Sequence, residues 1–117
     1  MLGLQILSAS FEEVQIRSVV QFNRHLSSKR GYKTAWKPMT LASPRWRLDR
    51  VSVNFIRHQL TNYDNVIVTL AGDAERIRST RLEILAGIAA AYPQVANECK
   101  RQAFIAGLRL MLLPRRI

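Results

Sequence analysis

Hydrophobic side chains recur with helical spacing after residue 49. They stand at Ile56, Leu60, Tyr63, Ile67 and Leu70, three or four positions apart. This spacing places all of them on one face of a helix. Asp49 is a suitable N-cap for such a helix, and Gly72 stands where a left-handed residue commonly ends one. The pattern therefore predicts one continuous helix from Asp49 to the residues just before Gly72.

Two more amphipathic helices are predicted downstream. Asp73 can N-cap the first of them, which ends at Tyr92 because Pro93 cannot continue it. Proline is tolerated in the first turn of a helix, so the second can follow at once and stop at Pro114. The apolar stripes consist of Ile77, Ile84, Leu85, Ile88 and Ala91 in the first, and Val95, Cys99, Ala103, Ala106, Leu110 and Leu113 in the second.

The N-terminal segment, residues 1–26, has two interpretations. Ser10 and Glu13 have the spacing of a capping box, which favours a helix from about residue 10 to 26. Val14, Ile16, Val20 and Phe22 all stand on even positions, which is a strand pattern. We expect the helix, with a strand pair as the alternative.

Residues 27–48 show neither period and contain Gly31, Pro38 and Pro44, so we expect an irregular segment there. Residues 49–114 would form a three-helix core, followed by a basic tail at 115–117. A chain of 117 residues suits one domain. The predicted fold is mainly α, a small antiparallel bundle of three to four helices with an irregular basic N-terminal segment.

The charge is unusual for a domain of this size. Eighteen Lys and Arg against eight Asp and Glu give a net charge of +10 and a pI near 11.1. Residues 14–50 carry nine bases and one acid, so the excess is concentrated around the irregular segment. Such a balance favours a polyanionic partner or an anionic membrane surface.

Basic and aromatic residues alternate within that segment. Cations neutralise phosphates and aromatic faces stack on unpaired bases, so the segment has the chemistry of an RNA- or DNA-binding arm. Two other interpretations stay open. The arm is then either a solvated loop whose tryptophans pack onto the bundle, or a docking surface for an acidic protein. The candidate residues are Lys29, Arg30, Tyr32, Lys33, Trp36, Lys37, Arg45, Trp46 and Arg47.

Arg57 and His58 extend this candidate surface. On the predicted helix they stand opposite the apolar face, where they could jointly hold a phosphate or a carboxylate. An ordinary polar face explains them equally well. We do not expect His58 to act as a base, because Asp64 is six positions away and would point from another side of a continuous helix.

Other kinds of chemistry find little support in the sequence. Two histidines and one cysteine cannot supply a Cys/His zinc site, and neither a glycine-rich phosphate loop nor a paired-carboxylate constellation is present. We therefore expect no enzyme activity, no cofactor or metal and no small-molecule substrate. A single thiol and the lack of a membrane-spanning run indicate a cytoplasmic protein.

The C-terminal helix supports a competing function. Leu108, Leu110 and Met111 cannot all face one small core, together with the two leucines that follow them. An exposed apolar patch of this kind is typical of an assembly subunit that forms homo-oligomers. The same patch beside Arg109 could instead lie on an anionic membrane surface.

Two strings in the chain resemble a group of small uncharacterised bacterial proteins of cyanobacterial type. They are Val53-Asn54-Phe55-Ile56-Arg57-His58-Gln59-Leu60-Thr61-Asn62-Tyr63-Asp64, and Ala91-Tyr92-Pro93 followed by Glu98-Cys99-Lys100-Arg101-Gln102. The resemblance covers residues 50–102 and includes Arg57 and His58. It implies no activity, cofactor or partner.

Overall fold

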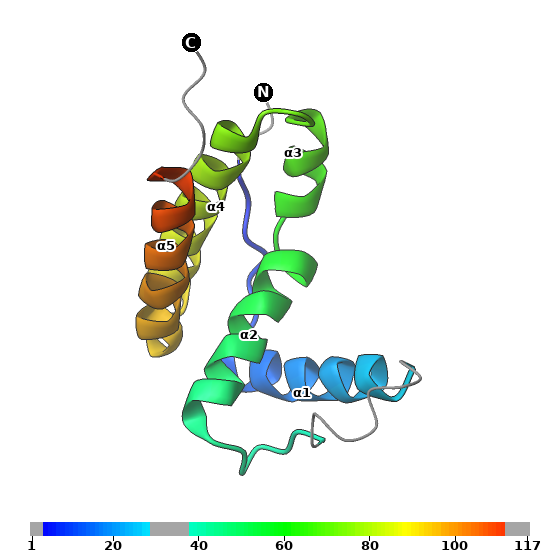
Figure 1. The fold of residues 1–117 in the computed structure, drawn as a ribbon. Helices are drawn as coiled ribbons and strands as arrows, with labels where there is room; N and C mark the ends of the chain where they lie inside the picture. The colour runs from blue at the N-terminus through cyan, green and yellow to red at the C-terminus, as the bar shows by residue number, and fades with distance from the viewer. Residues whose placement is uncertain (1–3, 29–37, 112–117) are drawn as a thin grey trace.

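The computed structural model describes residues 4–28 and 38–111 (Figure 1). The elements are α1 (Phe11–Ser28), α2 (Arg45–Gln59), α3 (Tyr63–Thr69), α4 (Ala74–Ala91), the 3-10 turn η1 (Pro93–Val95) and α5 (Ala96–Met111). The chain is mainly α, as the hydrophobic pattern predicts, but this part of it holds five α-helices where three to four are expected. None of the helices described is long and apolar enough to cross a membrane.

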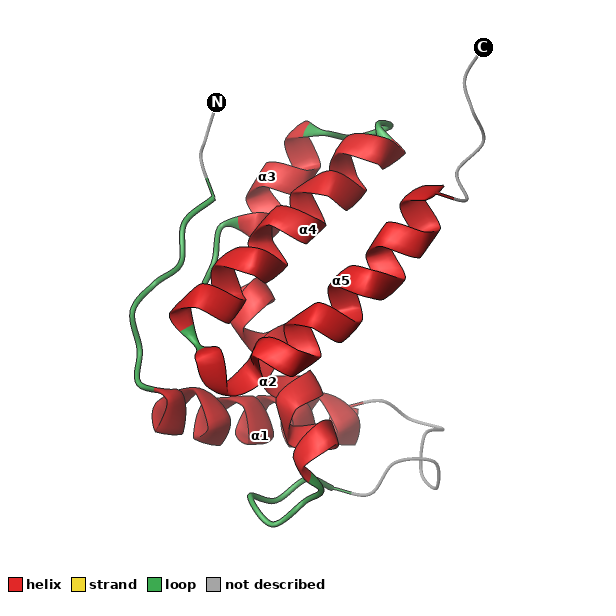
Figure 2. Cartoon of the chain, turned by 90° about the vertical axis from the view of Figure 1, so that its left-hand side faces the viewer, coloured by secondary structure: helices red, strands yellow, loops and turns green. Residues whose placement is uncertain are grey.

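The helices form two groups that meet at α2. Helices α4 and α5 run antiparallel, side by side, whereas α1 crosses α2 steeply (Figures 1 and 2). Segment 4–10 runs past the end of α2 to reach α1 (Figure 1). Helix α2 therefore has α1 on one side and the α4–α5 pair on the other.

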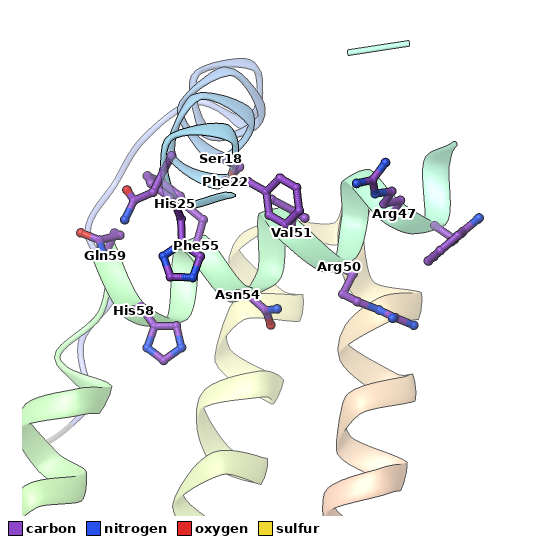
Figure 3. A pocket seen from close by; sticks show the side chains of 12 residues that line it. Ser18, Phe22, His25, Arg47, Arg50, Val51, Asn54, Phe55, His58 and Gln59 are labelled. Atoms are coloured by element: carbon purple, nitrogen blue, oxygen red, sulfur yellow. The ribbon is translucent and has the colours of Figure 1, made fainter. Parts of the chain in front are cut away.

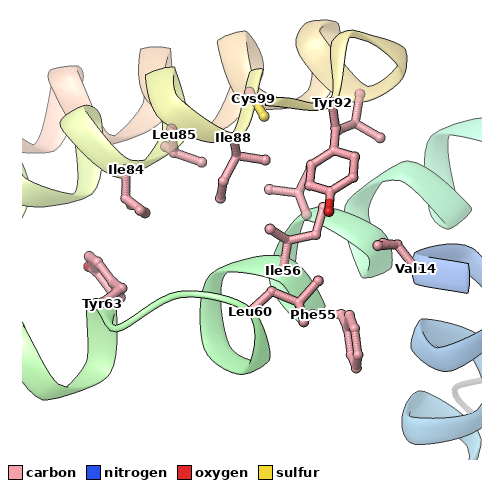
Figure 4. Close-up of a cluster of buried hydrophobic side chains, with 12 residues drawn as sticks. Val14, Phe55, Ile56, Leu60, Tyr63, Ile84, Leu85, Ile88, Tyr92 and Cys99 are labelled. Atoms are coloured by element: carbon pink, nitrogen blue, oxygen red, sulfur yellow. The ribbon is translucent and has the colours of Figure 1, made fainter. Parts of the chain in front are cut away.

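The main core fills the space between α2 and the α4–α5 pair. Ile84, Leu85 and Ile88 of α4 are at most 1% exposed and lie opposite Ile56 and Leu60 (Figure 4). Their spacing of one, three and four positions keeps them on one side of α4, which is why the helix buries that side.

Segment 11–28 is a helix, and the strand alternative is wrong. The Ser10 hydroxyl accepts a hydrogen bond from the backbone N–H of Glu13 at 3.1 Å, which caps the first turn. Val14 is fully buried, whereas Ile16 and Val20 are 44% and 50% exposed. The alternating apolar residues thus lie on two sides of a helix, one buried and one exposed.

Helix α2 begins earlier than expected. Its N-cap position is occupied by Pro44, whose φ of −52° suits the entry to a helix, and the first helical residue is Arg45. Residues 45–48, expected in the irregular segment, are therefore helical, and Leu48 is buried. Asp49 is not the N-cap but the partner of Arg45, at 3.1 Å.

The predicted helix from 49 to 72 is broken at Leu60–Asn62, which separates α2 from α3. The Thr61 hydroxyl donates to the carbonyl of Arg57 and accepts from the N–H of Tyr63. Segment 4–10 uses the backbone and side-chain groups that the break leaves available. Leu7 N–H donates to the Leu60 carbonyl at 2.7 Å, and Gln5 N–H donates to Asn62 Oδ1 at 2.8 Å.

The two ends of α4 follow their sequence signals. Gly72 has a positive φ of 86°, and the Asp73 carboxylate accepts from the N–H of Arg76 at 3.1 Å. Helix α4 ends at Ala91, just before the η1 turn that Pro93 begins. Both ends of α4 are therefore confirmed, because each depends on groups close in sequence, whereas the helix expected to follow at once at Pro93 begins at Ala96, after η1.

Candidate nucleic-acid interface

The crossing of α1 over α2 leaves an open groove of about 570 Å³ between them. Phe22 and His25 project from α1 toward α2, whose surface forms the other wall (Figure 3). The lining residues are Ser18, Gln21, Phe22 and His25 from α1, and Trp46, Arg47, Arg50, Val51, Asn54, Phe55, His58 and Gln59 from α2. We call this feature the α1–α2 groove.

A single stripe of α2 supplies the polar and aromatic groups of the groove. Trp46, Arg50, Asn54 and His58 are four residues apart, so they lie in one row along the helix. The row includes Trp46 because α2 starts at Arg45, four residues earlier than the sequence pattern predicts. Arg50 and Asn54 are thus lining residues that the predicted site lacks.

Arginines cover the aromatic rings at the α1–α2 junction. The guanidinium carbon of Arg47 lies 5.5 Å from the centre of the Phe22 ring, and that of Arg50 lies 5.3 Å from the Trp46 ring. Trp46 is still 57% exposed. The groove therefore presents an indole face beside two cations, a combination that can stack on a base and contact a phosphate.

Arg45 does not join this surface. Its Nε pairs with Asp49 at 3.1 Å, and its Nη2 donates to the carbonyl of Gln94 at 3.2 Å. Of the three predicted residues Arg45, Trp46 and Arg47, only the last two line the groove.

Six predicted residues, Lys29, Arg30, Tyr32, Lys33, Trp36 and Lys37, lie outside the described residues. The chain on both sides of these residues adjoins α1, which ends at Ser28. Asn23 of α1 accepts from the N–H of Met39 at 2.7 Å and donates to its carbonyl at 2.8 Å, and Met39 is 1% exposed. This clamp fixes the point at which the chain returns beside α1.

Arg57 is buried, and the prediction that it stands on an open polar face is wrong. It is 7% exposed, because α5 covers this side of α2. Its Nη1 donates to Gln102 Oε1 of α5 at 3.3 Å, and its guanidinium carbon lies 5.8 Å from the centre of the Tyr63 ring. Burial, and then the charge of Arg81, lower the pKa of Arg57. Arg57 therefore does not line the α1–α2 groove.

His58 pairs with Asp64, which the assumption of a continuous helix excluded. The break at Leu60–Asn62 interrupts the helical register between α2 and α3, so that Asp64 Oδ1 lies 2.9 Å from His58 Nδ1. His58 Nε2 lies 3.3 Å from Nη2 of Arg57. A carboxylate only accepts and a guanidinium only donates, so this geometry suits a neutral ring with its proton on Nδ1. The nitrogen that would act as a base is already engaged by Arg57.

The described residues contain no group of three or more His, Cys, Asp or Glu side chains that could hold a metal ion. No protein-family model, curated protein or solved structure matches the chain. The resemblance to cyanobacterial-type proteins stays a prediction.

Proposed function

We propose that the protein binds single-stranded RNA or DNA in the α1–α2 groove and catalyses no reaction on it. The observation that carries this proposal is the row Trp46, Arg50, Asn54 and His58, which sets an exposed indole beside a cation and hydrogen-bonding side chains. Stacking on an aromatic ring is available only to unpaired bases, which favours single strands over duplexes.

The cations of segment 29–37 complete the proposed interface. Lys29, Arg30, Lys33 and Lys37 would contact phosphates, and Tyr32 and Trp36 would add stacking surfaces. Both ends of this segment adjoin α1, one wall of the groove, through Ser28 and through the clamp of Asn23 on Met39. A cytoplasmic location belongs to the proposal, since nucleic acids are accessible there and the Cys99 thiol stays reduced.

Trp46→Ala tests the proposal. Because stacking contributes ~1–3 kcal/mol per base, the affinity for a labelled single strand should fall by about fivefold to a hundredfold. Fluorescence anisotropy with matched RNA and DNA strands measures it. Phe104→Ala is the control, because Phe104 is an exposed aromatic residue (67%) on α5, which takes no part in the groove. Equal binding by parent and Trp46→Ala would contradict the stacking role.

A second candidate function is assembly with other protein subunits. Phe104 and Leu108 are 67% and 43% exposed and stand four residues apart on α5, so they form an apolar strip on one side of that helix. Oligomers that dissociate in Phe104→Ala, observed by size-exclusion chromatography with light scattering, would favour this function. A monomer at all concentrations would remove its support.

A further inference from the structure

Four arginines converge on a second, smaller pocket on the other side of α2. The pocket has a volume of about 240 Å³ and lies between α2, α4 and α5. Its polar lining consists of Arg50, Asn54 and Arg57 from α2, Arg81 from α4, and Arg101 and Gln102 from α5. No acidic residue is among the described residues that line it, and we call it the arginine pocket.

Three of these guanidinium groups have a buried N–H without an acceptor. The Nε atoms of Arg50, Arg57 and Arg81 are inaccessible to solvent and have no hydrogen-bond partner in the described part of the chain. Arg57 is the most buried of the three, and its side-chain contacts with Gln102 and His58 are long, at 3.3 Å. A buried donor without an acceptor destabilises a fold, so such a cluster points to an acceptor that the protein itself does not supply.

The positive charge of the pocket is also only partly balanced by nearby carboxylates. Glu98 is the carboxylate next to the pocket, and it already accepts from Arg101 at 2.8 and 2.9 Å and from Gln102 at 2.6 Å. Burial alone would raise the pKa of Glu98, but these hydrogen bonds outweigh it and lower the pKa, so the carboxylate stays ionised. Asp64 also attracts Arg57 electrostatically, but it pairs with His58. The described carboxylates thus offset only part of the charge of the four guanidinium groups. The mutual repulsion between Arg57 and Arg81 is part of the cost.

The chemistry of the pocket selects a phosphate monoester. A guanidinium group matches the oxygens of a phosphate in a fork of two hydrogen bonds. A monoester carries a charge of about −1.5 to −2 and offers three terminal oxygens, whereas a carboxylate offers one charge and two oxygens. Several arginines around a pocket of this size are better balanced by the more highly charged anion.

We propose that the arginine pocket binds a phosphate monoester, and that this is the terminal phosphate of the strand held in the α1–α2 groove. Arg50 and Asn54 line both sites, so the two share a wall of α2. The proposal that a phosphate group binds here depends only on the residues of the arginine pocket. The assignment to a strand end rests on the proposed function, since a free phosphate ester has the same chemistry.

Arg81→Gln tests the pocket, with Arg76→Gln as the matched control. Both variants remove one positive charge from α4, but Arg76 is exposed and does not line the pocket. Loss of Arg81 relieves its repulsion with Arg57, so Arg81→Gln should melt no lower than the parent protein without phosphate. Inorganic phosphate, at constant ionic strength, should raise the melting temperature of the parent and of Arg76→Gln in a saturable manner. It should not do so for Arg81→Gln.

The second arm uses one single-stranded oligonucleotide with a 5′-phosphate, a 3′-phosphate or neither. A terminal phosphate at one end should tighten binding to the parent about tenfold, as expected for new charge-assisted hydrogen bonds, and should have no effect on Arg81→Gln. An equal rise in melting temperature with phosphate in Arg81→Gln and in the parent would overturn the proposal that the arginine pocket binds phosphate. Phosphate binding that needs Arg81, without any effect of a strand-terminal phosphate, would overturn the strand-end assignment. If phosphate binds through Arg81 but no strand binds at all, the proposed function fails and the phosphate pocket stands.

Discussion

Guanidinium groups act as packing surfaces in this protein as much as charges. Arg17 covers Phe55 at 5.3 Å, and Arg57 lies 5.8 Å from the centre of the Tyr63 ring. A flat, weakly hydrated cation can pack on an aromatic face, which a lysine ammonium does less well. Substituting these arginines by lysine would keep the net charge but lose the stacked contact.

Cys99 illustrates the opposite case, a polar group made inert by its surroundings. It is 2% exposed within the core, and burial, followed by the charge of Glu98, raises the pKa of its thiol to about 11. The raised pKa means that the fold favours the neutral thiol. This contribution to stability is complete below the pKa of the unfolded thiol and is lost as the pH rises through about 11.

The reactivity of Cys99 is a testable consequence. At pH 8 its thiolate fraction should be about 100-fold lower than in the unfolded chain, given a pKa of about 11 against an ordinary 9.0. Alkylation by iodoacetamide should be slower by at least that factor in native protein than in denaturing urea. The chain has one cysteine, so mass spectrometry follows a single site. Similar rates in the two conditions would show that Cys99 is not buried as described.

At the scale of the elements, local signals were sufficient for some boundaries and insufficient for others. Gly72, Asp73 and Pro93 each act on the turn in which they stand, so the limits of α4 could be predicted from the sequence. The break at Leu60–Asn62 involves contacts with segment 4–10, more than fifty positions away. Apolar periodicity continues across that break, so it predicts a continuous helix. On a continuous helix His58 and Asp64 would point from different sides, and their pairing could not be predicted.

The groove could be predicted only in part for the same reason. The chemistry of Trp46 and Arg47 marks them as candidates in the sequence, but their place on the helix follows from the start of α2 after Pro44. Phe22 and His25 belong to the groove because α1 crosses α2, which no local pattern indicates. The Thr61-Asn62 pair was the available signal for the break, since such side chains cap helix ends in preference to helix interiors.

Thr61→Ala should destabilise the protein by about 1 kcal/mol, the usual cost of losing a capping hydroxyl. The substitution removes the acceptor for the N–H of Tyr63 and the donor to the carbonyl of Arg57. Urea titration measures the free energy of unfolding. Thr80→Ala is the control, because Thr80 donates to the carbonyl of Arg76 within α4, where alanine is the better helix former. A Thr61→Ala variant as stable as Thr80→Ala would show that the break does not need this hydroxyl.

At the scale of the whole molecule, α2 organises the charged surface. One side of it faces α1 and forms the groove, and another faces α4 and α5 and forms the arginine pocket. Arg50 and Asn54 take part in both. The net charge of +10 explains attraction to any polyanion, so charge alone does not distinguish specific binding from unspecific binding. The position of the Trp46 ring in the groove does distinguish them, because stacking on it requires a base at that place.

The most direct test of the account is therefore the fluorescence of Trp46 itself. Trp36→Phe leaves Trp46 as the one tryptophan of the chain, and a single-stranded oligonucleotide is titrated against this variant while anisotropy of a labelled strand reports binding. The account predicts that Trp46 emission is quenched and shielded from acrylamide, with the same dissociation constant as the anisotropy change. Binding that leaves the emission and acrylamide accessibility of Trp46 unchanged would contradict the groove as the nucleic-acid site.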